Sequence, residues 1–368
     1  MGKIDVGRIL HQQHHGSGRG LFQSREQATS APVVLLVQDT TDIDLSHRRK
    51  ISGVGQIGNE RGRGFFVQTV LAVRPQTREV LGCMAQEPLV RISAPQGEQR
   101  YQRRKREERE SAVWMRQVQA IGTPESGSLW VHVGDRGADM FPFFQACRSA
   151  QTHFLVRAAQ NRRVQESEDE ITSSLTQARA FPSQASRVLE LPARHGHQKR
   201  SAQLQLAFGQ MTLLPPRQEP RAGKDPVTVW IVRVWEEQAP EGEEPLEWVL
   251  LTSVPTTTLE QAWERVDWYR HRWLVEIVQP QMTKAHILAS GGGGDHIADL
   301  HLLFRHDDAI DEQFNELSFL LKGSLSQSLL YPLAKGLDGL HHSCQFLMAL
   351  NVCLELTYLR SNRLQSLL

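Results

Sequence analysis

The sequence predicts an α/β fold in which helices flank a mixed central sheet, and three observations support this prediction. Of the 368 residues, 40% are hydrophobic and 23% are charged, which is ordinary for a globular protein. Short apolar runs rich in β-branched residues recur along the chain at the length of strands. In the middle of the chain these runs alternate with helical patterns, which indicates that the sheet is at least partly parallel.

Composition excludes several other classes of protein. The longest apolar runs are too short to form a transmembrane helix, so we expect no membrane partner. The first residues lack the apolar segment of a secretory signal peptide. The four cysteines, at positions 83, 147, 344 and 353, form no CxxC pair, which argues against a zinc ribbon and a disulfide framework. A reducing, cytoplasmic setting is therefore expected.

We expect the first part of the core at residues 31–160. Its strands are apolar runs that end at Gly, Pro or Asp residues. They are predicted at residues 33–37, 63–73, 79–85, 128–133 and 153–157. Helices are predicted at residues 100–120 and 139–148. The mixed basic and acidic run at residues 100–109 has two interpretations: a solvated helix surface with i,i+4 ion pairs, or a surface that faces phosphates.

The rest of the chain divides into segments that differ in composition and hydrophobic pattern. Residues 1–30 are polar and are expected to form a short tail. Residues 161–255 are rich in Gln and Arg and contain strand patterns at 227–235 and 246–252, which predicts a β-rich insertion. A helix is predicted over residues 256–285, where Thr257 and Glu260 match the capping-box pattern. Residues 286–368 form a divergent segment with mainly helical apolar patterns.

Three acidic residues stand out by their placement. Asp39 and Asp135 each follow an apolar strand, and Glu276 lies on the helix after the insertion. In open α/β sheets, sites collect outside the carboxyl ends of strands. Carboxylate oxygens suit Mg²⁺ or Mn²⁺, and two such ions about 3.5–4 Å apart can promote phosphodiester cleavage. The alternative is that each Asp forms a turn or caps a helix and that Glu276 faces solvent.

Tyr269, Arg272 and Glu276 occupy positions i, i+3 and i+7, so they project from one face of a helix. The Arg can bind a phosphate oxygen, and the Tyr can donate a hydrogen bond to the same nucleic-acid backbone. Spacing alone favours the alternative, a surface Arg–Glu pair beside a core Tyr.

Three blocks of the sequence resemble a known family. VVLLVQDTTDIDLSH, WVHVGDRGADMFPFF with FLVRA downstream, and PLEWVLLT followed by VDWYRHRWLVE are similar to the acidic blocks of DDE transposases. The match is to the IS-four group of cut-and-paste insertion sequences, which carries the YREK signature. It covers residues 31–276. The resemblance implies an RNase H-like core, a mixed sheet flanked by helices with a β-rich insertion before the last acidic helix.

The resemblance also implies roles for individual residues. Asp39, Asp135 and Glu276 correspond to the catalytic triad that binds metal, and the expected cofactor is a pair of Mg²⁺ or Mn²⁺ ions. Tyr269 and Arg272 correspond to contacts with the transposon-end backbone. The remaining expected DNA contacts are Trp248, Arg157 and Lys284. Trp248 corresponds to a residue that stacks on a flipped base during hairpin formation; the alternative is a core aromatic of a strand. Stacking of this kind contributes about 1–3 kcal/mol per base.

The implied activity is DNA transposition, in which water frees a 3′-OH, a hairpin forms and reopens, and the 3′-OH attacks target DNA. The expected partners are transposon ends, target DNA and a second copy of the chain in a nucleoid-associated synaptic complex. Two alternatives stay open. The chain could be an impaired fragment that binds DNA or dimerises and thereby inhibits an intact transposase. It could also be a metal-dependent nuclease without strand transfer.

The resemblance stops at Glu276. The family places a Lys seven residues beyond the Glu, whereas this chain has Thr283 there and Lys284 one residue later, turned by about 100° around a helix. Pro280 is expected to kink or end the helix. Residues 277–368 are therefore predicted to be a disrupted or rearranged segment, for which a frameshift is one origin. The short segment before residue 31 is expected to lack a domain that recognises transposon ends.

Overall fold

A mixed sheet of 12 strands is the main feature of the chain where the structure describes it. The computed structural model describes residues 4–5, 28, 31–47, 51–58, 62–92, 97–99, 102, 110–125, 127–165, 170–191, 200–217 and 225–276. The sheet belongs to the larger of two compact units, Ser17–Asp44 with Val54–Gln279. In the other unit, β1 (Ile4–Asp5) pairs in parallel with β3 (Ile51–Ser52).

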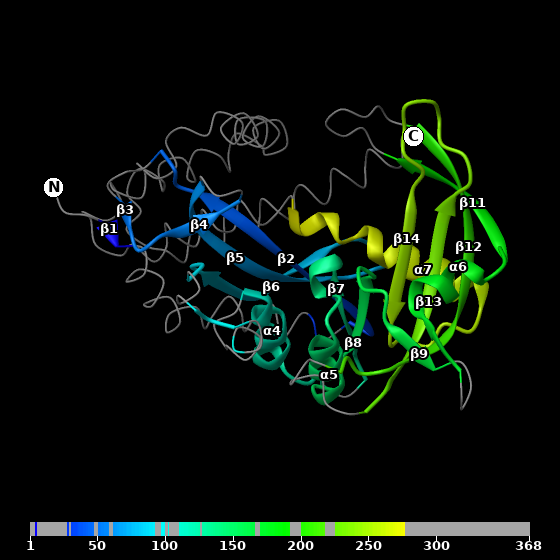
Figure 1. Cartoon of the computed structure of the whole chain (residues 1–368), viewed down its shortest axis with the longest axis horizontal. Coiled ribbons are helices and arrows are strands. Elements are labelled where there is room, and N and C mark those ends of the chain that lie inside the picture. The colour runs from blue at the N-terminus through cyan, green and yellow to red at the C-terminus, as the bar shows by residue number, and fades with distance from the viewer. Residues whose placement is uncertain are drawn as a thin grey trace, which may run out of the picture. The chain divides into compact units, whose positions relative to one another are not determined.

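The middle of the sheet combines antiparallel and parallel strands (Figure 1). Its strands are β2 (Val33–Asp44), β4 (Gly55–Ile57), β5 (Gly62–Val73), β6 (Val80–Leu89), β7 (Leu129–Gly134) and β8 (His153–Arg157). On one side, β2 pairs antiparallel with β5, which pairs antiparallel with β6. On the other side, β2 pairs parallel with β7, and β7 pairs parallel with β8. Buried apolar side chains on both faces of β2 and β7 fit strands covered from both sides.

The expected insertion extends this same sheet. It contains β9 (Arg163–Gln165), β10 (Ile171–Ser173), β11 (Ala185–Leu191), β12 (Arg200–Leu213), β13 (Val227–Glu236) and β14 (Glu247–Thr252). β14 pairs antiparallel with β8 of the core, and β13 and β12 follow in order. The strands β14, β13 and β12 therefore continue the hydrogen-bonded order of the core sheet.

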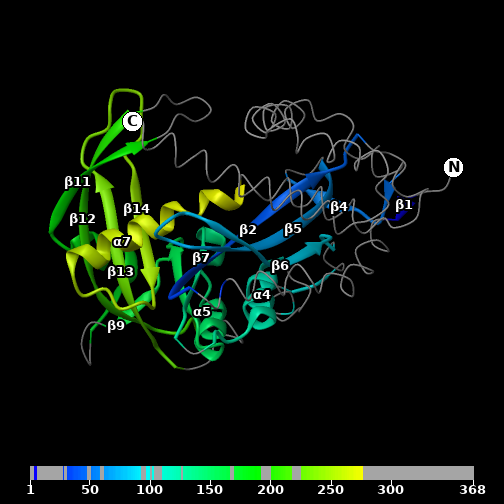
Figure 2. The ribbon, with the colours of Figure 1, turned by 180° about the vertical axis from the view of Figure 1, so that it is seen from behind.

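Helices lie on both faces of the sheet. They are η1 (Glu110–Ala112), α4 (Val113–Ile121), η2 (Arg136–Ala138), α5 (Phe141–Ser149), α6 (Ser174–Ala180) and α7 (Leu259–Arg270). In β14, Leu251 packs in the cluster around α5, whereas Trp248 contacts Tyr269 of α7. Because successive strand side chains point to opposite faces, α5 and α7 lie on opposite sides. The yellow α7 passes behind β13 and β14 in Figure 1 and in front of them in Figure 2.

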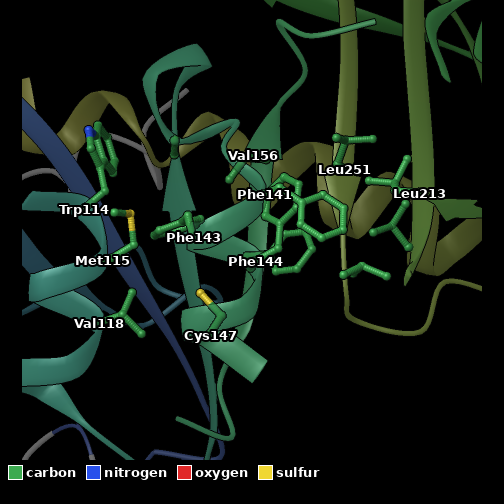
Figure 3. Close-up of a cluster of buried hydrophobic side chains, with 14 of the residues drawn as sticks. Trp114, Met115, Val118, Phe141, Phe143, Phe144, Cys147, Val156, Leu213 and Leu251 are labelled. Atoms are coloured by element: carbon green, nitrogen blue, oxygen red, sulfur yellow. The ribbon is translucent and has the colours of Figure 1, made fainter. Parts of the chain in front are cut away.

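An aromatic cluster joins the core to the insertion. Phe144 of α5 stacks on Phe154 of β8 with ring centroids 4.4 Å apart. Leu213 and Leu251, from the insertion strands, lie across from Phe141 and Phe144 (Figure 3). Each of these fully buried side chains stabilises the fold by roughly 1.5–3 kcal/mol relative to exposure. The core and the insertion therefore share one hydrophobic cluster.

The structure confirms the predicted α/β class and a mixed, partly parallel sheet that a few helices flank. The predicted first strand at 33–37 is too short, because β5 supplies a 12-residue partner that extends β2 to Asp44. Of the predicted helix at 100–120, the structure describes residue 102 and residues 110–120, and the regular helix begins at Val113. The N-cap of α7 is Thr258, not Thr257: its side chain accepts from the Gln261 amide.

Two expected segments fall largely or wholly outside the described residues. The predicted tail at 1–30 is described only at residues 4–5 and 28, and the predicted divergent segment at 286–368 is not described. Among the helices that are described, none combines the length and apolar content required to cross a bilayer.

Candidate active site

Asp39 lies on β2, and Asp135 directly follows β7, the parallel neighbour of β2. The ladder between β2 and β7 ends where Val37 pairs with Val133. Asp39 and Asp135 each follow two residues later, so they occupy equivalent positions. Because side chains alternate between the faces of a sheet, both carboxylates belong to the same face.

Asp39 is not at the end of its strand, as the sequence predicts, because β2 continues to Asp44 along β5. Only its parallel ladder with β7 ends just before Asp39. Asp135 does follow its strand directly. Its Oδ1 accepts a hydrogen bond of 2.7 Å from the Gly137 amide and so caps η2. The capping role that the sequence left open for Asp135 is therefore present in the structure.

Arg157 continues the same row on the next strand. Gly134 pairs with Val156 in the ladder between β7 and β8, so Asp135 and Arg157 are level one residue further on. The guanidinium Nη2 of Arg157 donates to the Glu247 carbonyl oxygen at 2.9 Å. Burial, followed by the charge of Arg136, lowers the pKa of Arg157. Because the cations Arg136 and Arg157 are close to each other, this end of the row attracts anions.

The helix face predicted from the sequence is directed at this row. Tyr269 lies in the last turn of α7, Arg272 follows the helix, and Glu276 belongs to a further helical turn at residues 273–276. Arg272 Nη1 donates to Asp39 Oδ2 at 3.2 Å, and its Nη2 donates to Glu276 Oε1 at 2.7 Å. Because the two carboxylates share one guanidinium, their bonded oxygens lie within about 10 Å of each other.

Burial and charge act in opposite directions on Asp39. The pKa of its carboxyl is raised to about 6, mainly by burial and to a smaller extent by the negative charges of Asp135 and Glu276. The Arg272 guanidinium and the Thr40 amide, which donates at 2.8 Å, lower it without compensating fully. The negative charges of Asp135 and Glu276 both act on the Asp39 carboxyl, as expected where a cation binds.

Arg272 is the most enclosed cation of the site, with 7% of its surface exposed. Burial lowers its pKa, but the hydrogen bond and charge of Glu276, together with the charge of Asp39, raise the pKa overall. Its guanidinium carbon also lies 4.4 Å from the centre of the Trp273 ring. The surface Arg–Glu pair considered from the sequence is thus a partly buried bridge between a helix and a strand.

Tyr269 and Trp248 contact each other where the insertion meets the candidate site. Their rings meet edge to face, with centroids 5.3 Å apart. Trp248 is 8% exposed, and burial raises the pKa of the Tyr269 hydroxyl, which the charges of Arg272 and Arg157 oppose. Trp248 is thus a packed strand aromatic in this structure, adjacent to the row of charged residues.

Seven of the eight predicted site residues are described and lie on or next to this face. Lys284 lies outside the described residues, as do Pro280 and the chain beyond it. The donor set suits Mg²⁺ or Mn²⁺, because Asp39, Asp135 and Glu276 offer only carboxylate oxygens. Across the described ranges, no three His, Cys, Asp or Glu side chains are grouped closely enough to hold a metal ion.

Sequence reasoning missed a set of polar residues around Asp39. Thr69 of β5 pairs with Asp39 across the ladder, and its hydroxyl accepts from Gln86 Nε2 at 3.1 Å. On the other face of β2, Gln38 contacts the buried His132. Polar residues within otherwise apolar strand patterns are the signal that could have identified them.

A search with models of known protein families finds none that matches this chain.

Proposed function

We propose that this protein is a metal-dependent DNA transposase of the DDE type, built on an RNase H-like core. The fold is compatible with this proposal, since β6, β5, β2, β7 and β8 form a mixed sheet with helices on both faces. A β-rich insertion then precedes the helix with the third acid, which is the order that the resemblance implies.

One observation carries the proposal: the contact between Arg272 and both Asp39 and Glu276. These residues come from the two ends of the resemblance, and Asp39 and Arg272 are 233 positions apart in the sequence. Asp135, directly after the adjacent strand β7, is level with Asp39. The link from Glu276 through Arg272 to Asp39, with Asp135 next to Asp39, is what supports the proposal.

Each residue has a defined part in the proposed reaction. Asp39, Asp135 and Glu276 are the residues that hold Mg²⁺ or Mn²⁺. A bound ion activates water and stabilises the leaving oxygen of a phosphodiester. Arg272 and Arg157 attract the phosphates of the transposon end, and Tyr269 donates a hydrogen bond to that backbone. Protein groups thereby position the DNA and stabilise charge, which are the main requirements of phosphoryl transfer.

Trp248 is proposed to stack on a base that is displaced when the hairpin forms. Its indole is packed against Tyr269, so stacking requires the Trp248 side chain to move or a base to reach its edge. A dimer of this chain that bridges two transposon ends in a nucleoid-associated complex completes the proposal. Lys284 is proposed as a further DNA contact on its distance in sequence from Glu276 alone.

The test is cleavage of duplex DNA that carries the ends of the element encoding the chain. We expect nicking with Mg²⁺ or Mn²⁺ and none with a chelator. Asp135→Asn should reduce nicking at least about 100-fold, because a bound ion contributes several kcal/mol of transition-state stabilisation. Asp267→Asn is the matched control, since Asp267 is a half-buried acid on α7 paired with Arg187 and Arg270. Nicking that survives Asp135→Asn would overturn the triad.

The same assay separates the alternatives. Joining of the freed 3′-OH to target DNA identifies a transposase. Metal-dependent nicking without joining identifies a nuclease that lacks strand transfer. DNA binding with no metal-dependent nicking, combined with inhibition of an intact transposase, identifies an impaired fragment.

A further inference from the structure

A buried chain of hydrogen bonds lies behind Asp39, on the opposite face of the sheet. Thr40 Oγ1 donates to Gln68 Oε1, and Gln68 Nε2 donates to Gln38 Oε1 at 3.5 Å. Gln38 Nε2 then meets His132 Nδ1 at 2.6 Å. The side chains of Gln38, Gln68 and His132 have no exposed surface. The chain links β5, β2 and β7 through side chains alone.

This polar chain is costly to the fold. Since Gln38 donates to Nδ1 of His132, the ring proton is on Nε2. That Nε2 is buried and has no hydrogen-bond partner among the described residues. Burial also lowers the pKa of His132 to about 3, so the ring stays neutral. Apolar side chains of similar shape would fill this space without an unsatisfied donor. The hydrogen-bonded side chains therefore have no evident value for the stability of the fold.

These hydrogen bonds hold β2 in place on both sides of Asp39. The backbone ladder between β2 and β7 ends at the pair of Val37 with Val133. Gln38, the next residue, is tied to β7 by its side chain contact with His132. Thr40, on the far side of Asp39, is tied to β5 by Gln68. Both neighbours of Asp39 are therefore anchored, at the point where the backbone no longer links the two strands.

We propose that Gln38 and His132 are positioning residues that keep Asp39 level with Asp135. They act through the backbone from the far face of the sheet and touch neither DNA nor a metal ion. This role rests on the proposed function, in which the spacing of the two carboxylates matters. Displacement of a reacting group by about 1 Å can reduce a rate by about 100-fold, so a rigid tie at this point is valuable.

Two variants of similar shape test the proposal. His132→Asn retains an acceptor near the position of Nδ1, whereas His132→Leu does not. Both remove the ring, and Asn leaves the larger cavity because Leu has about the same volume as His. In a purely structural role the Leu variant should be the better one, because a buried amide is costlier than an apolar side chain. In a positioning role the order of activity reverses. We expect His132→Asn to nick within about threefold of wild type and His132→Leu to lose about 10–100-fold.

A second measurement does not depend on activity. The Thr40 amide donates to Asp39 Oδ1, so its hydrogen exchange reports how firmly that carboxylate is held. We expect exchange of this amide to be at least about tenfold faster in His132→Leu and unchanged in His132→Asn. Thr152→Val is the control, because Thr152 is also buried and its hydroxyl donates to the Cys147 carbonyl at the far end of β8. It should leave Thr40 exchange unchanged.

The outcomes separate this proposal from the proposed function. If the wild-type chain does not nick DNA, the transposase assignment fails, and the exchange measurement alone decides whether His132 holds Asp39 in place. Equal exchange and equal activity in the two His132 variants would overturn the positioning role while leaving the assignment of the triad intact.

Discussion

Arg272 donates a hydrogen bond to Asp39 at 3.2 Å, although they are 233 positions apart in the sequence. The same guanidinium bonds Glu276, so one buried cation ties the end of α7 to the middle of β2. An arginine suits this place because its planar fork of donors can serve two carboxylates at once. The contact fixes the distance between the first and the last acid of the candidate site.

The raised pKa of Asp39 predicts how stability depends on pH in metal-free buffer. Its folded pKa of about 6 exceeds the ordinary value of 3.8, so between these values the folded state binds a proton that the unfolded state has lost. The free energy of unfolding of the wild type must therefore fall as the pH rises through this window. Asp39→Asn removes that dependence and keeps an acceptor for Arg272. It should be more stable than wild type at pH 7, by up to about 3 kcal/mol.

Urea unfolding at pH 4, 5, 6 and 7 in a chelator measures this difference. The advantage of Asp39→Asn should be largest at pH 7 and disappear near pH 4. Asp42→Asn serves as the reference, because Asp42 is an exposed acid on the same strand. A difference between Asp39→Asn and wild type that stays constant across this range would contradict the prediction.

Asp139 is close to Asp135 in sequence, but its predicted role is to stabilise the fold and not to take part in the reaction. Its side chain is fully buried, and its Oδ2 accepts from the amides of Ala159 and Gln160 at 2.7 Å each. Its Oδ1 accepts from the Arg162 guanidinium. Asp139→Ala leaves a buried cation and two amides unpaired, and should lower the free energy of unfolding by about 3–5 kcal/mol.

Urea denaturation of Asp139→Ala and of Asp267→Ala measures this cost against a partly exposed ion pair. The partly exposed pair should contribute no more than about 1 kcal/mol. Equal losses in the two variants would mean that the buried network around Asp139 does not stabilise the loop after β8.

The sequence predicted the carboxylates and the helix face because those inferences depend on local order. A strand that ends in Asp135 and a helix that carries Tyr269 and Arg272 at i and i+3 can be recognised without tertiary structure. The contact of Arg272 with Asp39 cannot be recognised in this way, because spacing along a helix does not show which other element the helix faces. The tie from Gln38 to His132 joins two strands whose pairing must be known first. These parts of the site depend on the sheet order rather than on any motif.

The same reasoning explains the errors in the boundaries of elements. β2 extends beyond the apolar run because β5 offers a long antiparallel partner, and hydrogen bonds to that partner outweigh the polar character of residues 39–44. The cap of α7 moved by one residue because Thr257 and Thr258 are both able to cap. The Gln261 side chain accepts from the Thr257 amide, which leaves Thr258 as the N-cap.

Substitutions of Trp248 can distinguish a role in stacking on DNA from a role in packing the protein core. Trp248→Ala removes a buried ring that contacts Tyr269, so it should lower stability by about 3–5 kcal/mol and requires assays at low temperature. Relative to first-strand nicking, hairpin formation should fall further in Trp248→Ala than in Trp248→Phe, since Phe retains a ring for stacking. The measurement is the ratio of hairpin to nicked product on a gel.

Trp235→Ala is the matched control for this ratio. Trp235 lies on β13 with its ring under the Arg233 guanidinium, and it alternates to the face of the sheet opposite Trp248. Its truncation should leave the ratio of hairpin to nicked product unchanged. If Trp248→Ala reduces nicking and hairpin formation equally, the stacking role is wrong and Trp248 serves packing alone.

Gly134 is predicted to set the position of Asp135, because the site has no room for a larger residue there. A Cβ at Gly134 would lie 2.5 Å from the Ala138 Cβ and 3.0 Å from Trp114, so Gly134→Ala must displace η2. This overpacking should cost about 1–3 kcal/mol and slow metal-dependent nicking, since Asp135 caps the same turn. Adding Ala138→Gly removes the closest obstacle, so the double variant should regain stability and nicking together. A double-mutant cycle on unfolding free energy and nicking rate measures this coupling. Strictly additive effects in that cycle would show that Gly134 does not position Asp135 through the turn.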